Sequence, residues 1–222
     1  MFFVTLIEFC KERGYEIVLL TLEHIQLTAI SVGLAVSFAV PVGIFLTRMP
    51  KISPAVMGFA SVIQTIPSLA LFGLVIPLLM AFSLPIIGWV PALLALFLYA
   101  LLPILRNTFT GIDQVDPSIT EAGKGMGMTD QQILWRVEFP LALPVIMAGI
   151  RTSAVISVGV ATLAALIGAG GLGELIFRGL RTINYKLMLA GAIPAALLAL
   201  FLDYALSQTG RVFTPKGVSM TR

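Results

Sequence analysis

The sequence predicts an all-α membrane protein with five transmembrane helices. Hydrophobic residues make up 58% of the 222 positions, charged residues make up 11%, and the mean hydropathy is +1.01. Soluble domains carry about 25% charged residues, so this composition excludes that class. The basic residues also divide unevenly between the ends of the apolar stretches, which predicts an orientation in the membrane.

Five apolar stretches, separated by polar or Gly/Pro-containing breaks, approach the roughly 20 residues that cross a hydrocarbon core of about 30 Å. We expect the spans at residues 25–47, 55–80, 92–104, 145–167 and 187–206. The third stretch reaches full length only if it extends to Trp89 or continues beyond Leu105.

The basic residues favour one side of these spans. Nine of the fourteen fall on that side: Arg48, Lys51, Arg106, Lys124, Arg136, Arg151, Arg211, Lys216 and Arg222. The positive-inside rule then places the N-terminus outside and the C-terminus in the cytoplasm of a bacterial inner membrane. We read 1–222 as one transmembrane domain, with an outer interfacial segment at 1–24, a cytoplasmic loop at 111–144, an outer loop at 168–186 and a cytoplasmic tail at 209–222.

The N-terminal segment has neither the basic leader nor the small-residue cleavage site of a signal peptide, and its apolar run is too short to span. We therefore expect a helix lying on the outer face. Cys10 is the only cysteine and His24 the only histidine, so the sequence predicts no internal disulfide and no metal site. The net charge of +3 follows from the topology and does not indicate binding to nucleic acid.

A polar patch interrupts the second predicted span near its middle. It consists of Gln64, Thr65, Pro67 and Ser68. Polar groups at this depth need partners or water, and a proline there breaks the helix. Two interpretations stay open: the patch lines a water-filled path through the membrane, or it is a kink packed against neighbouring helices.

The cytoplasmic loop contains the start and stop signals of two short helices. Asp116 before Pro117 predicts an N-cap, with Ser118 and Glu121 as an alternative capping box. Gly125 and Gly127 would end this first helix. Thr129 and Gln132 form a second capping box, which opens a helix that we expect to stop before Pro140.

This loop resembles the EAA loop of permease subunits from ATP-binding-cassette (ABC) importers, which docks in a groove of the ATPase subunit. The positions that align with the pattern of that loop are Glu121, Ala122, Gly123, Gly127, Val137 and Pro140. The sequence departs from that family at Gly123, Val137 and Phe139, where the family has alanine, isoleucine and leucine. The resemblance implies that residues 121–123 supply the docking surface and that Gly127 forms the elbow between the two helices.

The resemblance covers nearly the whole chain. Segments 63–70, 102–108, 162–173 and 191–197 are similar to permeases of osmoprotectant importers, which carry glycine betaine, carnitine or choline. Permeases of methionine importers have a similar five-span core, so methionine or another amino acid is an alternative cargo. A secondary transporter or channel that needs no ATP is a more distant alternative.

The resemblance also implies partners and a non-catalytic role. The chain contains no G-x-x-x-x-G-K-[ST] sequence, so ATP would be bound and hydrolysed by a separate ATPase dimer. We expect no cofactor and no catalytic residues in this chain. The other expected partners are a second permease, identical or paralogous, a periplasmic or lipid-anchored substrate-binding protein, and membrane lipid.

The glycines at 168, 170 and 173 fit the dinucleotide pattern G-x-G-x-x-G, but that mechanism needs a preceding strand, and here a membrane span precedes. We interpret this segment as a turn at the outer end of the fourth span, and the resemblance places it in the outer gate region.

Asp203 would be costly if unpaired in the fifth span, so we expect an ion pair with Arg106 or Arg151, or snorkelling to water. Trp89 and Trp135 are interpreted as interfacial anchors and Tyr99 as a packing residue.

Overall fold

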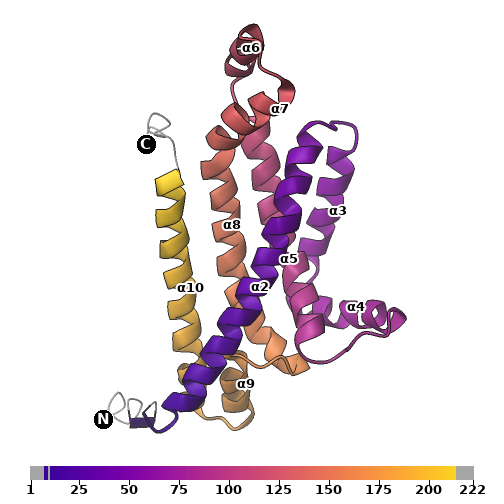
Figure 1. Cartoon of the computed structure of the whole chain (residues 1–222). Coiled ribbons are helices and arrows are strands. Elements are labelled where there is room, and N and C mark those ends of the chain that lie inside the picture. The colour runs from indigo at the N-terminus through magenta and orange to yellow at the C-terminus, as the bar shows by residue number, and fades with distance from the viewer. Residues whose placement is uncertain (1–7, 10, 214–222) are drawn as a thin grey trace.

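The computed structural model describes residues 8, 9 and 11–213, with only the backbone for 211–213. These residues form helices and no strand, arranged as an elongated bundle (Figure 1), which confirms the all-α prediction. We call the end that carries α6 and α7 in Figure 1 the upper end, and the end that carries α9 the lower end. Cys10 lies outside the described residues. So do residues 1–7 of the predicted interfacial segment and residues 214–222 of the predicted tail.

Four long helices run along the bundle: α2 (Gly14–Thr47), α5 (Trp89–Asp113), α8 (Phe139–Ala161) and α10 (Tyr185–Phe213). The shorter elements are α3 (Ser53–Thr65), α4 (Ser68–Ala81), α6 (Pro117–Gly125), α7 (Asp130–Ile133), the π-helical turn η1 (Leu134–Glu138), the 3₁₀ helix η2 (Thr162–Ile167) and α9 (Gly173–Arg181). Among the described residues, four helices are long and apolar enough to span a membrane, and the count rises to five if α3 and α4 together form one span.

The first span helix begins earlier than the sequence predicted. α2 starts at Gly14 and runs for 34 residues, which corresponds to about 51 Å at 1.5 Å per residue. This exceeds a hydrocarbon core of about 30 Å. Residues 14–24 therefore continue the span helix and do not form a separate helix, because Leu20 and His24 are buried against the bundle and no proline interrupts the run.

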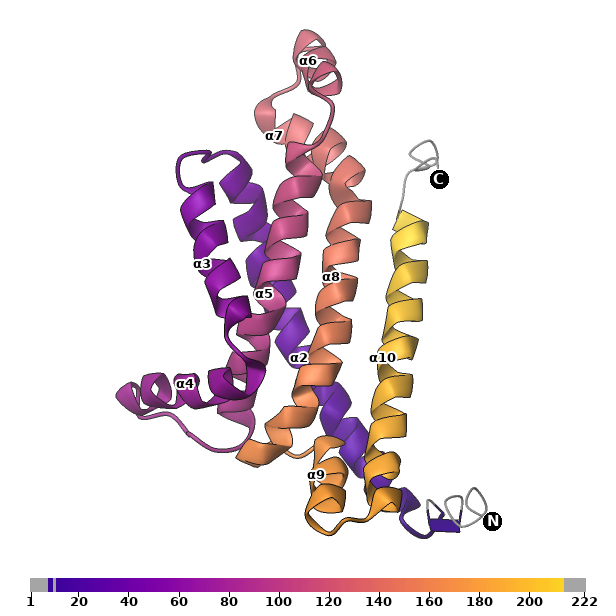
Figure 2. The same ribbon diagram turned by 180° about the vertical axis from the view of Figure 1, so that it is seen from behind.

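The predicted second span at 55–80 is divided into two helices, and the division lies at the proline break that the sequence predicted. α3 and α4 meet at an angle of 112°. Ile66 adopts an extended conformation with φ −68° and ψ 127°, because a residue that precedes proline is restricted away from the helical region. α4 then lies across the bundle near its lower end, where it buries Leu71, Phe72 and Val75 (Figures 1 and 2).

α5 lies between α2 and α8, and small residues allow the close approach. A Cβ added to Gly43 of α2 would come within 2.8 Å of the Thr108 Cβ on α5. A Cβ added to Gly149 of α8 would come within 2.7 Å of the Pro103 carbonyl oxygen, also on α5. Close backbone contact through small residues is typical of membrane helices. The third span is longer than predicted, because it includes Trp89 and continues to Asp113.

Candidate coupling segment and polar sites in the spans

The segment from Asp116 to Glu138 projects beyond the upper end of the bundle (Figure 1). α6 begins where the Asp116 carboxylate accepts the backbone N–H of Ser118 at 2.8 Å, with Pro117 at the first helical position. This hydrogen bond to the backbone holds the pKa of Asp116 below its usual range. The alternative cap by Ser118 and Glu121 does not form, since Asp116 occupies the N-cap position.

α6 ends in a Schellman motif with Gly127 as the left-handed residue, at φ +80°. The Gly127 N–H donates to the Lys124 carbonyl at 2.9 Å, and the Met128 N–H donates to the Gly123 carbonyl at 3.1 Å. This pair of bonds satisfies carbonyls that the helix end leaves free. Gly127 therefore forms the turn between α6 and α7, as predicted, while Gly125 is the last residue of α6.

The second capping box forms as predicted, but the helix does not stop before Pro140. The Gln132 N–H donates to the Thr129 hydroxyl at 3.3 Å, and the Thr129 N–H donates to the Gln132 side chain at 2.9 Å. α7 then continues through η1 into α8, where the Phe139 N–H donates to the Leu134 carbonyl five residues back. This change of register places Pro140, which has no N–H to donate, in the first turn of α8.

The resemblance assigned the docking surface to Glu121, Ala122 and Gly123, and the structure corrects this for one residue. Glu121 and Ala122 are exposed, but Gly123 is buried. Gly123 faces Ile133, and a Cβ added to Gly123 would lie 3.4 Å from the Ile133 Cγ1 atom. Gly123 therefore packs α6 against α7 and is not available to a partner.

Three large apolar side chains on this segment were not singled out as contact residues in the sequence. Ile119, Met126 and Trp135 are 43%, 76% and 58% exposed. The Trp135 ring also lies 5.3 Å from the Phe139 ring, measured between centroids. Exposed apolar side chains on a projecting segment are candidates for contact with a protein partner. The sequence signal was the presence of apolar residues in a segment that is otherwise polar.

An ion pair ties the projecting segment to α2. Glu138 in η1 is buried and pairs with Arg48, the C-cap residue that follows α2. The two residues are 90 positions apart, so no local pattern predicts their pairing. The segment is thus attached to the spans by this ion pair and by the backbone, which enters from α5 and continues into α8.

The polar patch of the second predicted span lies at the break between α3 and α4. The Tyr99 hydroxyl of α5 donates to the Ile66 carbonyl, which the break leaves without a helical partner. Thr65 is exposed, and Gln64 and Ser68 are half-buried. The backbone at the break is thus packed and satisfied, as the kink interpretation expects, while the exposed polar side chains leave the path interpretation open.

Asp203 pairs with Arg151, one of the two partners proposed from the sequence. The Arg151 Nε and Nη2 atoms donate to the two carboxylate oxygens at 2.5 and 2.7 Å, joining α8 to α10. Arg106 instead donates to the Ser61 hydroxyl of α3 at 3.3 Å.

The glycine-rich turn at the lower end is built around α2. Gly168, Gly170 and Gly171 have φ values of +76°, +77° and +78°. The Gly171 N–H donates to the Glu23 carboxylate at 3.1 Å, and the His24 Nε2 atom lies 3.0 Å from the Val158 carbonyl oxygen. The 3₁₀ helix η2 precedes this turn where a dinucleotide site would need a strand.

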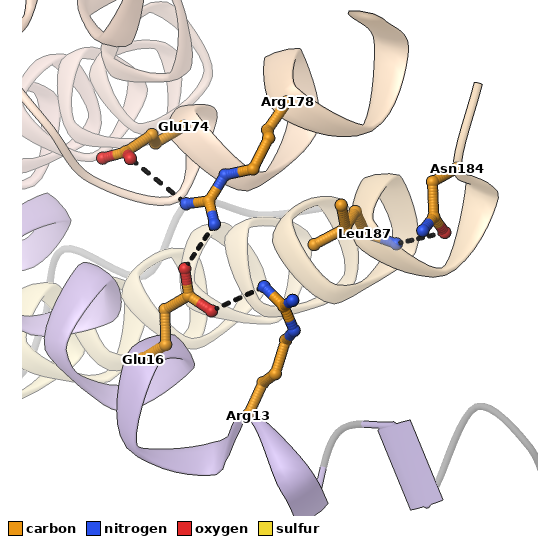
Figure 3. Close-up of polar contacts among 6 residues, drawn as sticks. All are labelled: Arg13, Glu16, Glu174, Arg178, Asn184 and Leu187. Atoms are coloured by element: carbon orange, nitrogen blue, oxygen red, sulfur yellow. Dashed lines mark hydrogen bonds and ion pairs between the residues drawn. The ribbon is translucent and has the colours of Figure 1, made fainter. Parts of the chain in front are cut away.

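Arg178 of α9 also joins α9 to α2 at the lower end (Figure 3). Its guanidinium donates to Glu16 of α2 at 2.7 Å and to Glu174 at 3.1 Å, and Arg13 donates to Glu16 at 3.1 Å. Asn184 caps α10 by accepting the Leu187 N–H at 3.4 Å. No group of His, Cys, Asp and Glu in the described part of the chain could hold a metal ion.

Comparison with known proteins agrees with this architecture. Residues 39–211 match the family described as "Binding-protein-dependent transport system inner membrane component". The glycine betaine/carnitine/choline transport system permease protein OpuCB of Bacillus subtilis is 48% identical over 95% of this chain and 94% of the relative. The choline transport system permease protein OpuBB of the same organism is 47% identical over 96% and 95%. A chain of the MetNI methionine ABC transporter has the same fold, with a TM-score of 0.83, 23% identity, and coverage of 91% of this chain and 98% of that one.

Proposed function

This chain belongs to the family of binding-protein-dependent transport system inner membrane components, and we propose on that premise that it is the permease of an ATP-driven importer for small osmoprotectants. The observation that carries the proposal is the projecting segment at the upper end, with Glu121 and Ala122 exposed on a capped helix. A separate ATPase docks on this segment and supplies the energy, and this chain itself has no catalytic site or cofactor.

The upper end is the cytoplasmic end in this proposal. The projecting segment carries Lys124 and Arg136, and Arg48 and Lys51 lie in or beside the turn between α2 and α3. This distribution is the one that the positive-inside rule favours for a cytoplasmic side. The N-terminus and α9 then face outward, toward a substrate-binding protein.

The cargo proposal rests on the relatives. Two permeases that are 47–48% identical to this chain are named for glycine betaine, carnitine and choline, and the match covers 94–95% of the length of each. The likeness to the methionine transporter supports the fold alone, because the identity is 23%. We therefore propose quaternary ammonium compounds as the cargo, with methionine as the alternative to be tested.

The attachments of the projecting segment suggest how docking moves the spans. The segment continues through η1 into α8 and is paired to the end of α2 through Arg48 and Glu138. When ATP closes the ATPase dimer, two such segments, one from each permease of a dimer, would approach each other and turn α8 and α2 as rigid bodies. This opens the path outward, and hydrolysis resets it inward.

The test is uptake of labelled glycine betaine into proteoliposomes that contain the permease, its ATPase and its binding protein. Glu121→Lys reverses the charge of an exposed side chain on α6, so it should abolish uptake and ATPase stimulation without lowering the amount of folded permease. Gly127→Val should also lower uptake, because a β-branched side chain is strained in the left-handed conformation of the turn that positions α6.

Asp113→Lys provides the matched control, since it makes the same charge change on an exposed residue of the upper end outside α6. Normal uptake in the control with none in Glu121→Lys supports the docking surface. Equal uptake in all variants would refute it. Methionine uptake by the native chain without betaine uptake would refute the cargo.

A further inference from the structure

The charged side chains within the spans differ in their partners. Arg151 forms a bidentate ion pair with Asp203 between α8 and α10. Arg106 on α5 has no acidic partner among the described residues, and its contact is the neutral Ser61 hydroxyl at 3.3 Å. The Arg106 side chain is exposed on the surface of this single chain.

Arg106 lies well below the upper end of the bundle. It precedes the end of α5 at Asp113 by seven residues, which corresponds to about 10 Å along the helix. Ser61 follows the start of α3 at Ser53 by eight residues, or about 12 Å. A cation at this depth is costly against lipid unless it reaches the interface, faces a water-filled cavity or has a negatively charged partner.

The surroundings of Arg106 offer hydrogen bonds without negative charge. Ser61 donates its hydroxyl proton to the Met57 carbonyl at 2.8 Å, so its oxygen is free to accept from Arg106. Gln64 and Thr65 follow on the next turn of α3, on the same side as Ser61. No hydrogen bond joins the Gln64 amide to another described residue. This strip therefore presents a guanidinium and an amide, both of which are donors to an anion.

We propose that Arg106, together with Gln64, binds the carboxylate of a zwitterionic cargo as it crosses the membrane. The planar guanidinium matches a carboxylate with two parallel hydrogen bonds, and Ser61 holds it in place. The inference rests on the proposed function and adds a distinction within it. Glycine betaine and carnitine have a carboxylate, whereas choline has a hydroxyl group there and no negative charge.

The experiment measures uptake of glycine betaine, carnitine and choline by the native complex and by the complex with Arg106→Gln, in proteoliposomes with the binding protein saturated. We expect glycine betaine and carnitine uptake to fall by about tenfold or more, the range for losing a charged hydrogen bond. Choline uptake should stay unchanged or rise, because a like charge is removed from its path. Arg106→Lys should restore part of the betaine uptake, and Gln64→Ala should reduce it less than Arg106→Gln does.

Two further measurements keep the test decisive. ATPase stimulation by the loaded binding protein should persist in Arg106→Gln. The substitution impairs the movement of cargo through the permease and leaves the binding of the ATPase and of the binding protein intact. Lys51→Gln, which removes an exposed cation from the turn between α2 and α3, should leave uptake of all cargoes unchanged.

Several outcomes would overturn the inference. Equal loss for all three cargoes together with loss of ATPase stimulation would show a structural role. A defect that appears only in vesicles with anionic lipids, and vanishes in pure phosphatidylcholine, would assign Arg106 to a lipid phosphate. If the native complex carries none of the three cargoes, the proposed function fails. If it carries betaine but not choline, retained betaine uptake in Arg106→Gln refutes the site.

Discussion

Both ends of the bundle require glycine, but for different physical reasons. At the upper end, a Cβ added to Gly127 would meet no atom within 4 Å, so this glycine is needed only for its backbone conformation. At the lower end, a Cβ added to Gly173 would lie 1.8 Å from the Thr162 carbonyl oxygen. The upper end is thus a free-standing segment shaped by local rules, whereas the lower end is a packed joint.

Ion pairs follow the same division. At the lower end, Arg178 of α9 pairs with Glu16 of α2 and with Glu174, and a hydrogen bond from the Gly171 N–H to Glu23 adds to these ion pairs. The projecting segment at the upper end has one such tie, from Glu138 to Arg48. A segment that must bind another protein has few contacts with its own chain, whereas a joint that holds three helices together has many. Four predictions test this comparison.

The largest effect on stability is expected for Gly173→Ala. The added methyl group would overlap backbone atoms that cannot move without separating α9 from η2, so we expect a loss of about 3 kcal/mol or more in unfolding free energy. The measurement is thermal unfolding and the yield of monodisperse protein in detergent. Gly159→Ala is the control, because this glycine lies near the C-terminal end of α8 and a Cβ added to it would meet no atom within 4 Å. Equal stability of the two variants would contradict the packed joint.

Gly127→Ala should cost about 1–2 kcal/mol, the strain of a left-handed residue with a side chain. The loss should appear as local opening of residues 117–138, seen as faster hydrogen exchange at the Met128 amide, while the melting temperature of the spans stays nearly constant. Gly127→Asn should cost less, since asparagine tolerates this conformation. A large drop in the melting temperature would show that the upper end is not independent.

Arg178→Gln should cost about 1 kcal/mol or less, because both partners are about one-third exposed. A double-mutant cycle with Glu16→Gln isolates the coupling between α9 and α2. The coupling should weaken in high salt, as expected for a partly exposed pair. A coupling energy of zero at low salt would show that this ion pair does not stabilise the contact between α9 and α2.

The smallest effect is expected for Gly123→Ala, which introduces the residue found at this position in the resembled importers. The new Cβ would lie at ordinary van der Waals distances, 3.4 Å from Ile133 Cγ1 and 3.5 Å from Met128 Sδ. Alanine in a helix is favoured over glycine by up to about 1 kcal/mol, so the variant should be equally or slightly more stable and should retain uptake. Loss of ATPase stimulation would show that Gly123 contacts the partner after all.

Local signals in the sequence predicted most of the projecting segment. The cap by Asp116 and the capping box of Thr129 and Gln132 involve residues two or three positions apart, so their geometry follows from the order of residues alone. The predicted stop before Pro140 failed, because a π-helical turn accommodates the proline and no spacing rule indicates such a turn. The exposure of Met126 and Trp135 also depended on how α6 and α7 fold together.

By itself, the sequence determined the class of the protein, the approximate positions of its spans and the capping of its short helices, because hydropathy and caps act over a few neighbouring residues. The tertiary structure decided the 112° bend at Pro67, the choice of Arg151 over Arg106 as the partner of Asp203, and the burial of Gly123. The first two depend on atoms brought together from distant parts of the chain, and the third depends on how α6 folds against α7. A proline specifies that a helix is interrupted, but only the surface that α4 packs against sets the direction in which the chain continues.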